Sequence, residues 1–357
     1  FFMMLLGIGG CTALIVTGLA LQDNFEGVAD VQYSQIDLYD ATATFNHTLT
    51  DKEQATFEKD FDKDIDKLLY SYAGSADITA NGMTHSISLN APVDAKATEP
   101  FFDWHDGEQA LSFPKDDEIL LDRGMADRLG VTAGDEVVLR DGDMHETTLT
   151  VSGVFDNYIS NNSYITRNTL KSAFGQNDVN SAYIIFEDGV DSHEVAAKMM
   201  GEDFVTNVPV VEDSMDMFGD MLDSLDLIVL VIILCAGLLA FIVLYNLTNI
   251  NISERIREIA TLKVLGFYSH ETNAYVFREN SALSVFGALF GLLLGKALHA
   301  FVMAQIVVDG LHFDAVVSWQ NYAIAFVLTM IFAMVTQLIM RHKISKIHMA
   351  ESLKSVE

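Results

Sequence analysis

Residues 227–267 read LIVLVIILCAGLLAFIVLYNLTNINISERIREIATLKVLGF, and this stretch decides the fold. Its first part, Leu227 to Tyr245, carries no charge. At 1.5 Å per residue, a helix of this length crosses a hydrocarbon core of ~30 Å. The part that follows repeats Ile252, Ile256 and Ile259 at helical spacing, with charged residues on the other face. The pattern predicts a membrane span and then a short amphipathic helix on the membrane surface, which is either an interfacial linker or a docking helix for a cytoplasmic partner.

Three further apolar runs are long enough to cross a bilayer, and they are Phe1 to Leu21, Ser281 to Val308 and Tyr322 to Met340. The sequence between the first two spans is polar and mixed. We therefore expect a membrane protein with four transmembrane α-helices and a large α+β extracytoplasmic domain inserted between the first and second helices. The predicted boundaries are 1–22 for the first helix, 23–224 for the domain, 225–343 for the three-helix part and 344–357 for a cytoplasmic tail.

The negative charge of the chain is confined to the predicted domain. From Gln22 to Leu225 there are 41 Asp and Glu against 12 Lys and Arg, whereas the rest of the chain is balanced. A phosphate backbone is repelled by such a surface, so nucleic acid is excluded as a partner. The acidity suits a cationic ligand, a cation-rich wall or a salty medium, or it is simply a solvated surface.

Basic residues after the second and fourth spans set the orientation. Arg255, Arg257 and Lys263 follow the second span, and Arg341 and Lys343 follow the fourth. By the positive-inside rule both flanks are cytoplasmic, which places residues 23–224 outside the cell and the C-terminus inside. The run starting at Phe1 has no basic flank, so we expect a retained span preceded by further sequence, with a cleaved signal peptide as the competing interpretation.

Within the domain, alternating apolar residues predict strands and helices in turn. We expect a strand over 31–38, a charged helix over 49–72 and a strand over 83–89. Strands at 119–121, 137–139 and 147–154 flank a helix over 123–129 that Gly130 ends. Further along, helices at 163–174 and 192–200 alternate with strands at 182–186 and 204–211, and the chain is helical from Ser214 into the second span.

The third span repeats Gly287, Gly291 and Gly295 every four residues, which predicts close helix packing along one face. Elsewhere the pattern offers no catalytic motif: GxSxG, HExxH, CxxC and Walker sequences are absent. The loop FFDWHDGE, with Asp103, His105, Asp106 and Glu108, lacks the paired spacing of metal motifs. We therefore expect a non-catalytic chain without a metal site.

The stretch ISERIREIATLKVLGF, the glycine ridge and the tail KIHMAESLK together resemble the FtsX/MacB family of ABC transporter permeases, as do LLDRGMADRLGVTAGDEVVL and TVSGVF in the domain. The order of these motifs covers nearly the whole chain. The resemblance implies one span before a large exterior domain and three after it, a MacB-like domain and an FtsX-like permease part.

The resemblance also implies partners and a coupling site. The family's coupling helix corresponds here to about 252–266, and the residues expected to face the ATPase are Ser253, Glu254, Arg255, Arg257, Glu258, Lys263 and Gly266. The implied partners are a cytoplasmic ABC ATPase, a second permease half or a second copy, the lipid bilayer and an extracytoplasmic protein or peptide. No cofactor is expected in this chain, because ATP and Mg²⁺ belong to the partner ATPase.

Three functions remain open from the sequence. The first is a permease subunit that converts ATP hydrolysis into motion of the exterior domain, for export or extraction of a peptide, lipoprotein or drug. The second is a non-transporting sensor or regulator of a cell-wall hydrolase, and the third is a passive adhesin without an ATPase partner. Few ionisable groups lie at mid-membrane depth, which favours mechanical coupling over conduction. The sequence does not identify the substrate.

Overall fold

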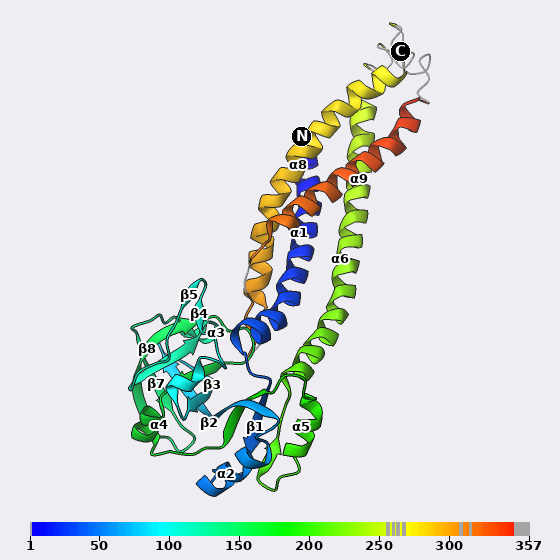
Figure 1. The fold of residues 1–357 in the computed structure, drawn as a ribbon. Coiled ribbons are helices and arrows are strands. Elements are labelled where there is room, and N and C mark those ends of the chain that lie inside the picture. Colours follow the sequence, from blue (N-terminus) through cyan, green and yellow to red (C-terminus); the bar gives the residue numbers. More distant parts are fainter. Residues whose placement is uncertain are drawn as a thin grey trace. The chain divides into compact units, whose positions relative to one another are not determined.

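The computed structural model describes residues 2–254, 258, 261, 265, 269–306, 310–313 and 316–345 (Figure 1). The chain divides into two compact units. One, the helical unit, comprises 1–25, 222–307 and 314–357, and the other, the domain unit, comprises 26–221 and 308–313. The two are described separately below.

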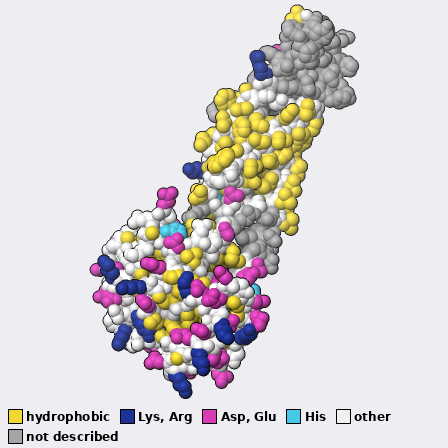
Figure 2. All heavy atoms as spheres, in the orientation of Figure 1, with side chains coloured by type: hydrophobic (Ala, Val, Ile, Leu, Met, Phe, Trp, Pro, Cys, Tyr) yellow, Lys and Arg dark blue, Asp and Glu magenta, His cyan; other side chains and the backbone are white. Residues whose placement is uncertain are grey.

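The helical unit is built from long apolar helices. They are α1 (Phe2–Val31), α6 (Val211–Glu254), α8 (Ser269–Gln305) and α9 (Trp319–Ser345), and α1 and α6 each continue into the domain unit. Four segments are long and apolar enough to cross a membrane, namely Leu5–Ile36, Val229–Ile250, Asn280–Gln305 and Trp319–Ile339. Figure 2 shows their hydrophobic side chains gathered on the outside of the helices. The prediction of four apolar helices and a large α/β domain is confirmed, whereas insertion into a bilayer stays a prediction.

The domain unit contains a large mixed sheet in the strand order β11-β1-β10-β2-β3-β9-β6-β8-β7. The strands are β1 (Ala41–Phe45), β2 (Ile65–Ala80), β3 (Met83–Pro92), β6 (Glu118–Asp122), β7 (Glu136–Arg140), β8 (Glu146–Phe155), β9 (Asn162–Ile165), β10 (Ser181–Phe186) and β11 (Val205–Asn207). A separate hairpin pairs β4 (His105–Asp106) with β5 (Gln109–Ala110). The shorter helices are α2 (Asp51–Asp60), α3 (Arg123–Leu129), α4 (Arg167–Phe174) and α5 (Ser192–Met199), with a 3₁₀ turn, η2 (Ala95–Thr98).

The long strand β2 connects two lobes of the domain. Its second half pairs with β3 and also with β7, where Asp77 lies opposite Arg140, so that β2, β3, β9, β6, β8 and β7 close into a barrel. Ile78, Leu121 and Leu139 are fully buried in the barrel core. The first half of β2 pairs with β10, in a lobe where α2 and α5 contribute to a second core. One strand therefore belongs to both lobes.

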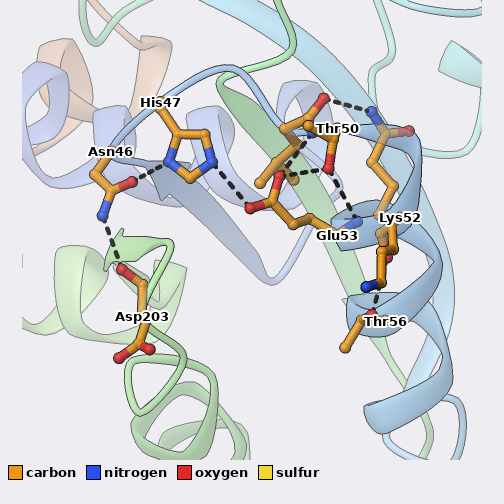
Figure 3. A network of polar contacts seen from close by, with 9 residues as sticks. Asn46, His47, Thr50, Lys52, Glu53, Thr56 and Asp203 are labelled. Carbon is orange, nitrogen blue, oxygen red and sulfur yellow. Dashed lines mark hydrogen bonds and ion pairs between the residues drawn. The ribbon is translucent and has the colours of Figure 1, made fainter.

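The helix α2 begins at a capping box. The Thr50 hydroxyl accepts a hydrogen bond from Glu53 N, and the Glu53 carboxylate accepts one from Thr50 N at 2.8 Å. His47 Nε2 contacts Glu53 Oε1 at 3.1 Å, and Asn46 Nδ2 donates to the Asp203 carbonyl oxygen at 2.8 Å (Figure 3). These contacts hold the start of α2 to the loop that precedes it and to the loop before β11.

Two predicted elements are wrong at the domain's beginning. Residues 31–38 do not form a strand, because α1 continues to Val31 and a π-helical turn, η1 (Gln32–Ile36), follows. Val28, Gln32 and Ile36 are buried at helical spacing, so the burial period there is that of a helix. The predicted helix over 49–72 ends at Asp60 and gives way to β2.

Pairing with neighbouring strands explains the second error. Leu69, which the sequence pattern placed on a helix stripe, lies opposite Tyr183 of β10 in the sheet. Likewise, residues 162–165 form a strand instead of the start of a helix, because β9 pairs with both β3 and β6. The predicted strand over 204–211 is shorter, since β11 ends at Asn207 and α6 begins at Val211. The remaining strands and helices predicted for the domain are present.

Candidate functional site

The predicted coupling segment lies mostly outside the described residues. Arg255, Arg257, Lys263 and Gly266 are not described. Ser253 and Glu254 form the last turn of α6, where the Ser253 hydroxyl donates to the Asn249 carbonyl oxygen at 2.9 Å. Ser253, Glu254 and Glu258 are exposed. Because α6 begins at Val211 in the domain unit, one continuous helix leads from the domain to the first residues of this segment, whose role as an ATPase contact stays a prediction.

In the helical unit, the glycines of α8 lie directly against α1. A Cβ atom added at Gly291 would come within 2.5 Å of Thr12 Cβ and 2.6 Å of the Gly9 carbonyl oxygen. At Gly287 and Gly295, the added atom would meet an α1 side chain at 2.9 and 2.7 Å. Such distances leave no space for a methyl group, so the two backbones approach each other as closely as glycine permits.

Polar side chains of α1 also contact α8 and α9. Thr12 and Thr329 share a hydrogen bond of 3.1 Å within the apolar part of the unit. Asp23 Oδ2 accepts hydrogen bonds from Ser318 Oγ at 2.9 Å and Asn321 Nδ2 at 2.8 Å. The contact between Thr12 and Thr329 is buried and the Asp23 carboxylate is exposed, and together they add polar contacts to the packing of α1 against α9.

Where α1 ends, a buried polar cluster joins the chain to a loop of the domain. The Gln32 side chain is 0% exposed and makes four hydrogen bonds. Its Nε2 donates to Asp37 Oδ2 at 2.7 Å and Asn157 Oδ1 at 2.9 Å, while its Oε1 accepts from the backbone N–H groups of Tyr158 and Ile159. We call Gln32, Asp37 and Asn157 the joint cluster. A buried network of this kind with every amide atom paired fixes local geometry.

Asp37 is the titratable member of the joint cluster and is 5% exposed. Burial raises its pKa from 3.8 to about 7, and the hydrogen bond from Gln32 only partly opposes this increase. Asp37 N also donates to the Gln32 carbonyl oxygen at 2.8 Å, so side chain and backbone hold the same turn. The carboxyl group is therefore held next to the end of α1 in surroundings that disfavour its charge.

The start of α6 and residues 310–312 are also hydrogen-bonded to this part of the domain unit. Val211 N, at the first residue of α6, donates to the Asp40 carbonyl oxygen at 2.8 Å, three residues after Asp37. Ser160 N donates to the Gly310 carbonyl oxygen at 2.7 Å, and His312 N donates to the Tyr158 carbonyl oxygen at 3.0 Å. The end of α1, the start of α6 and residues 310–312 are thus all hydrogen-bonded to a small part of the domain. The sequence offered no signal for this arrangement beyond polar residues placed after the first apolar run.

The acidic loops of the domain carry no catalytic arrangement that we recognise among the described residues. In the loop FFDWHDGE, Asp106 pairs with Arg123, whose Nε also donates to Asp156 Oδ1 at 2.5 Å. A different group, Asp141, Asp143 and His145, brings possible ligand atoms within 4.8 Å of one another.

In that group, one carboxylate is already used by its own turn. Asp141 Oδ1 accepts from the backbone N–H groups of Asp143 and His145, and Asp141 Oδ2 contacts His145 Nδ1 at 3.0 Å. The contact raises the pKa of His145 above its usual value. We assign this turn a local structural role.

Comparison with known proteins shows what the C-terminal part of the chain is similar to. Residues 230–349 match the model of the FtsX-like permease C-terminal domain. No curated protein matches the chain. Among solved structures, the periplasmic region of MacB from Actinobacillus actinomycetemcomitans is 12% identical, with 52% of this chain and 94% of that one covered and a TM-score of 0.35. The extracellular domain of the noncanonic ABC-type transporter YknZ from Gram-positive bacteria is 17% identical, with 47% and 98% covered and a TM-score of 0.32. The matched segment contains α8, α9 and most of the apolar part of α6, and this part of the chain, which is less than half of it, is similar to the FtsX-like permease C-terminal domain.

Proposed function

We propose that this chain is the permease subunit of an ABC transporter in which a separate cytoplasmic ATPase moves the extracytoplasmic domain. The family of residues 230–349 supports the permease role. In this proposal the chain itself is non-catalytic, the ATPase binds the segment at about 252–266, and a second permease half or a second copy completes the transporter. The material moved is an amphiphile such as a peptide, lipoprotein or drug.

The proposed movement of the extracytoplasmic domain is supported by the hydrogen bonds at the end of α1 and at the start of α6. The end of α1 is held by the joint cluster, and the first residue of α6 is bonded to Asp40. A shift of either helix along its axis therefore has to move the domain backbone or break these hydrogen bonds, of which those of Gln32 are buried. Motion arriving at the far end of α6 reaches the domain through Val211 without a flexible linker in between, since α6 is continuous from Val211 to Glu254.

The helical unit supports motion of whole helices over passage of solutes through it. The α1–α8 contact is closed by glycine packing, and the polar side chains of α1 that we describe are hydrogen-bonded to neighbouring helices. In the described parts of the four spans, Lys296 is the one Lys or Arg that lies within a span, and it is exposed. The acidic residues within the spans, Asp23, Glu26 and Asp30, all lie in the second half of the first span, so the rest of the spans offers few charges to a hydrophilic solute.

The docking of the ATPase is tested by charge reversal in the coupling segment. The double variant Arg257→Glu/Glu258→Arg, in the complex purified with its ATPase, is expected to lose ATPase binding or stimulation. The matched control is Asp66→Lys/Lys67→Glu, another adjacent pair of opposite charges, which is half exposed on β2 and paired at 3.4 Å. Unchanged ATPase binding and activity in the coupling-segment variant would refute the docking role.

A further inference from the structure

A pocket of about 370 Å³ opens in the domain unit beside the first turn of α6. Three parts of the domain line it, and these are Tyr33 of η1 with residues 38–40, the turn 186–190 after β10 with Ser192, and Val210 with the start of α6. Its volume falls within the range of about 300–1,000 Å³ that is typical of small-molecule sites. The lining thus combines the segment that follows α1 with the segment that begins α6.

The charge of the pocket has a single sign. Asp40, Glu187, Asp188 and Glu212 line it, and no lysine or arginine is among its lining residues. Asp40 Oδ2 accepts a hydrogen bond from Phe186 N at 2.8 Å. Among the described residues, no cation or side-chain donor pairs with Glu187 or Asp188, and both side chains are exposed.

One basic group, the half-exposed His193, contacts a carboxylate at the edge of the pocket, and its hydrogen bond with Asp213 together with the charges of Asp213 and Glu212 raises its pKa. His193 lies 4.0 Å from Glu212, but its Nε2 contacts Asp213 Oδ1 at 2.8 Å, outside the lining. Figure 2 shows acidic side chains with basic ones among them on the face of the domain that it presents, and the domain as a whole has a large excess of acidic residues. An anionic ligand is therefore repelled from this pocket, and a cationic one is attracted.

Aromatic and aliphatic side chains supply the smaller, apolar part of the surface. Tyr33, Tyr39 and Phe186 line the pocket together with Leu38 and Met215. Ring faces attract a cation as well as an apolar group, and the aliphatic side chains can bury a short stem. Carboxylates alone would suit a hydrated ion, but this combination suits a cation attached to apolar atoms.

We propose that this pocket binds a protonated amine or guanidinium group carried on a short apolar stem, supplied either by a small organic amine or by a basic side chain of a peptide. Because the lining includes residues 38–40 and Val211, an occupant contacts both sides of the Asp40–Val211 connection. Occupancy then stabilises one arrangement of these two segments. Binding itself needs no ATPase, so it is measured independently of the proposed transport function.

The test is equilibrium dialysis of the full chain in phosphatidylcholine nanodiscs at 150 mM salt, with empty discs subtracted. The probes are 2-phenylethylamine, the neutral 2-phenylethanol, the anionic 3-phenylpropanoate and the N-acetylated tripeptide amide Phe-Lys-Phe, whose one cation is the lysine side chain. We expect the amine, the tripeptide or both to bind, and the alcohol to bind at least about tenfold more weakly than the amine, because it lacks the charge. The tighter of the two cationic probes identifies the source of the group.

Three variants assign the binding to this pocket. Glu187→Gln/Asp188→Asn is expected to weaken binding about fivefold, as two exposed ion pairs are removed. Leu38→Lys, at a side chain that is 38% exposed, places a tethered ammonium group in the pocket and is expected to abolish binding. Asp62→Asn, an exposed carboxylate away from the lining, controls for the general negative field.

The proposal is overturned if neither cationic probe binds, if the alcohol binds as tightly as the amine, or if Asp62→Asn weakens binding as much as the double variant. Circular dichroism of each variant confirms that the domain is folded. A chain that binds the amine but does not stimulate or respond to any ATPase keeps this proposal and removes the transport proposal. The two can therefore fail separately.

Discussion

Asp37→Asn should change the pH dependence of the domain's stability. The pKa of Asp37 rises from 3.8 to about 7 on folding, because the carboxyl group is buried. Between these two values the folded state holds a proton that the unfolded state has lost, so stability falls as pH increases through this window. At about 1.4 kcal/mol per pH unit, the loss reaches an upper limit of about 4 kcal/mol by pH 8.

The asparagine variant keeps the shape and the acceptor of the joint cluster. Its amide oxygen can still accept the Gln32 Nε2 hydrogen bond, which is 2.7 Å long in the native chain. The variant should match the native chain near pH 4 and become more stable than it as pH increases, by up to about 4 kcal/mol at pH 8. Asp122, whose pKa burial also raises to about 7, is present in both proteins, so its contribution cancels in the difference.

The assay is urea unfolding of the full chain, followed by fluorescence between pH 4 and pH 8. The chain has two tryptophans, and in a Trp319→Phe background the remaining one, Trp104, is 5% exposed in the aromatic core of the domain. The unfolding free energies of the variant and the native chain are subtracted at each pH. A difference that stays constant across this range would show that Asp37 is not held away from water and would refute the reasoning.

Three further substitutions test the packing of α1 against α8, the hydrogen bond between Val211 and Asp40, and the start of α2. Gly291→Ala should separate α1 from α8 and lower the melting temperature in detergent by several degrees. Its control is Gly10→Ala, where the added methyl group faces open space, and this variant should melt within about a degree of the native chain or above it. Val211→Pro fits the first helical position but removes the N–H that donates to the Asp40 carbonyl oxygen. We therefore expect this variant to move less substrate while its ATPase activity persists. Val211→Ala is the control, and equal transport by both variants would contradict the coupling model. Thr50→Ala removes the capping box of α2 and should lower the unfolding free energy by about 1 kcal/mol in the same urea assay, and an unchanged midpoint would contradict that value (Figure 3).

The joint cluster was not predicted from the sequence, because its members come from distant parts of the chain. Gln32 and Asn157 are 125 residues apart and meet only when the loop after β8 folds against the end of α1. The pattern at 31–38 was interpreted as a strand, and that interpretation gave Asp37 no particular role. Nothing in a local pattern indicates that a carboxyl group will be buried by residues far along the chain.

The apolar helices were determined by local composition, since about twenty consecutive apolar residues have few alternatives to a spanning helix. The same holds for short elements with clear end signals, such as α3. Asp122 caps its start, and Gly130, in a left-handed conformation (φ 64°), caps its end. Tertiary structure decided the rest. Leu69 lies in a strand because β10 and β3 pair with β2 on both sides, and long-range pairing outweighs the helical periodicity of the local sequence. The pocket likewise exists only because segments 38–40, 186–190 and the start of α6 meet, and no one of them would be acidic and concave alone.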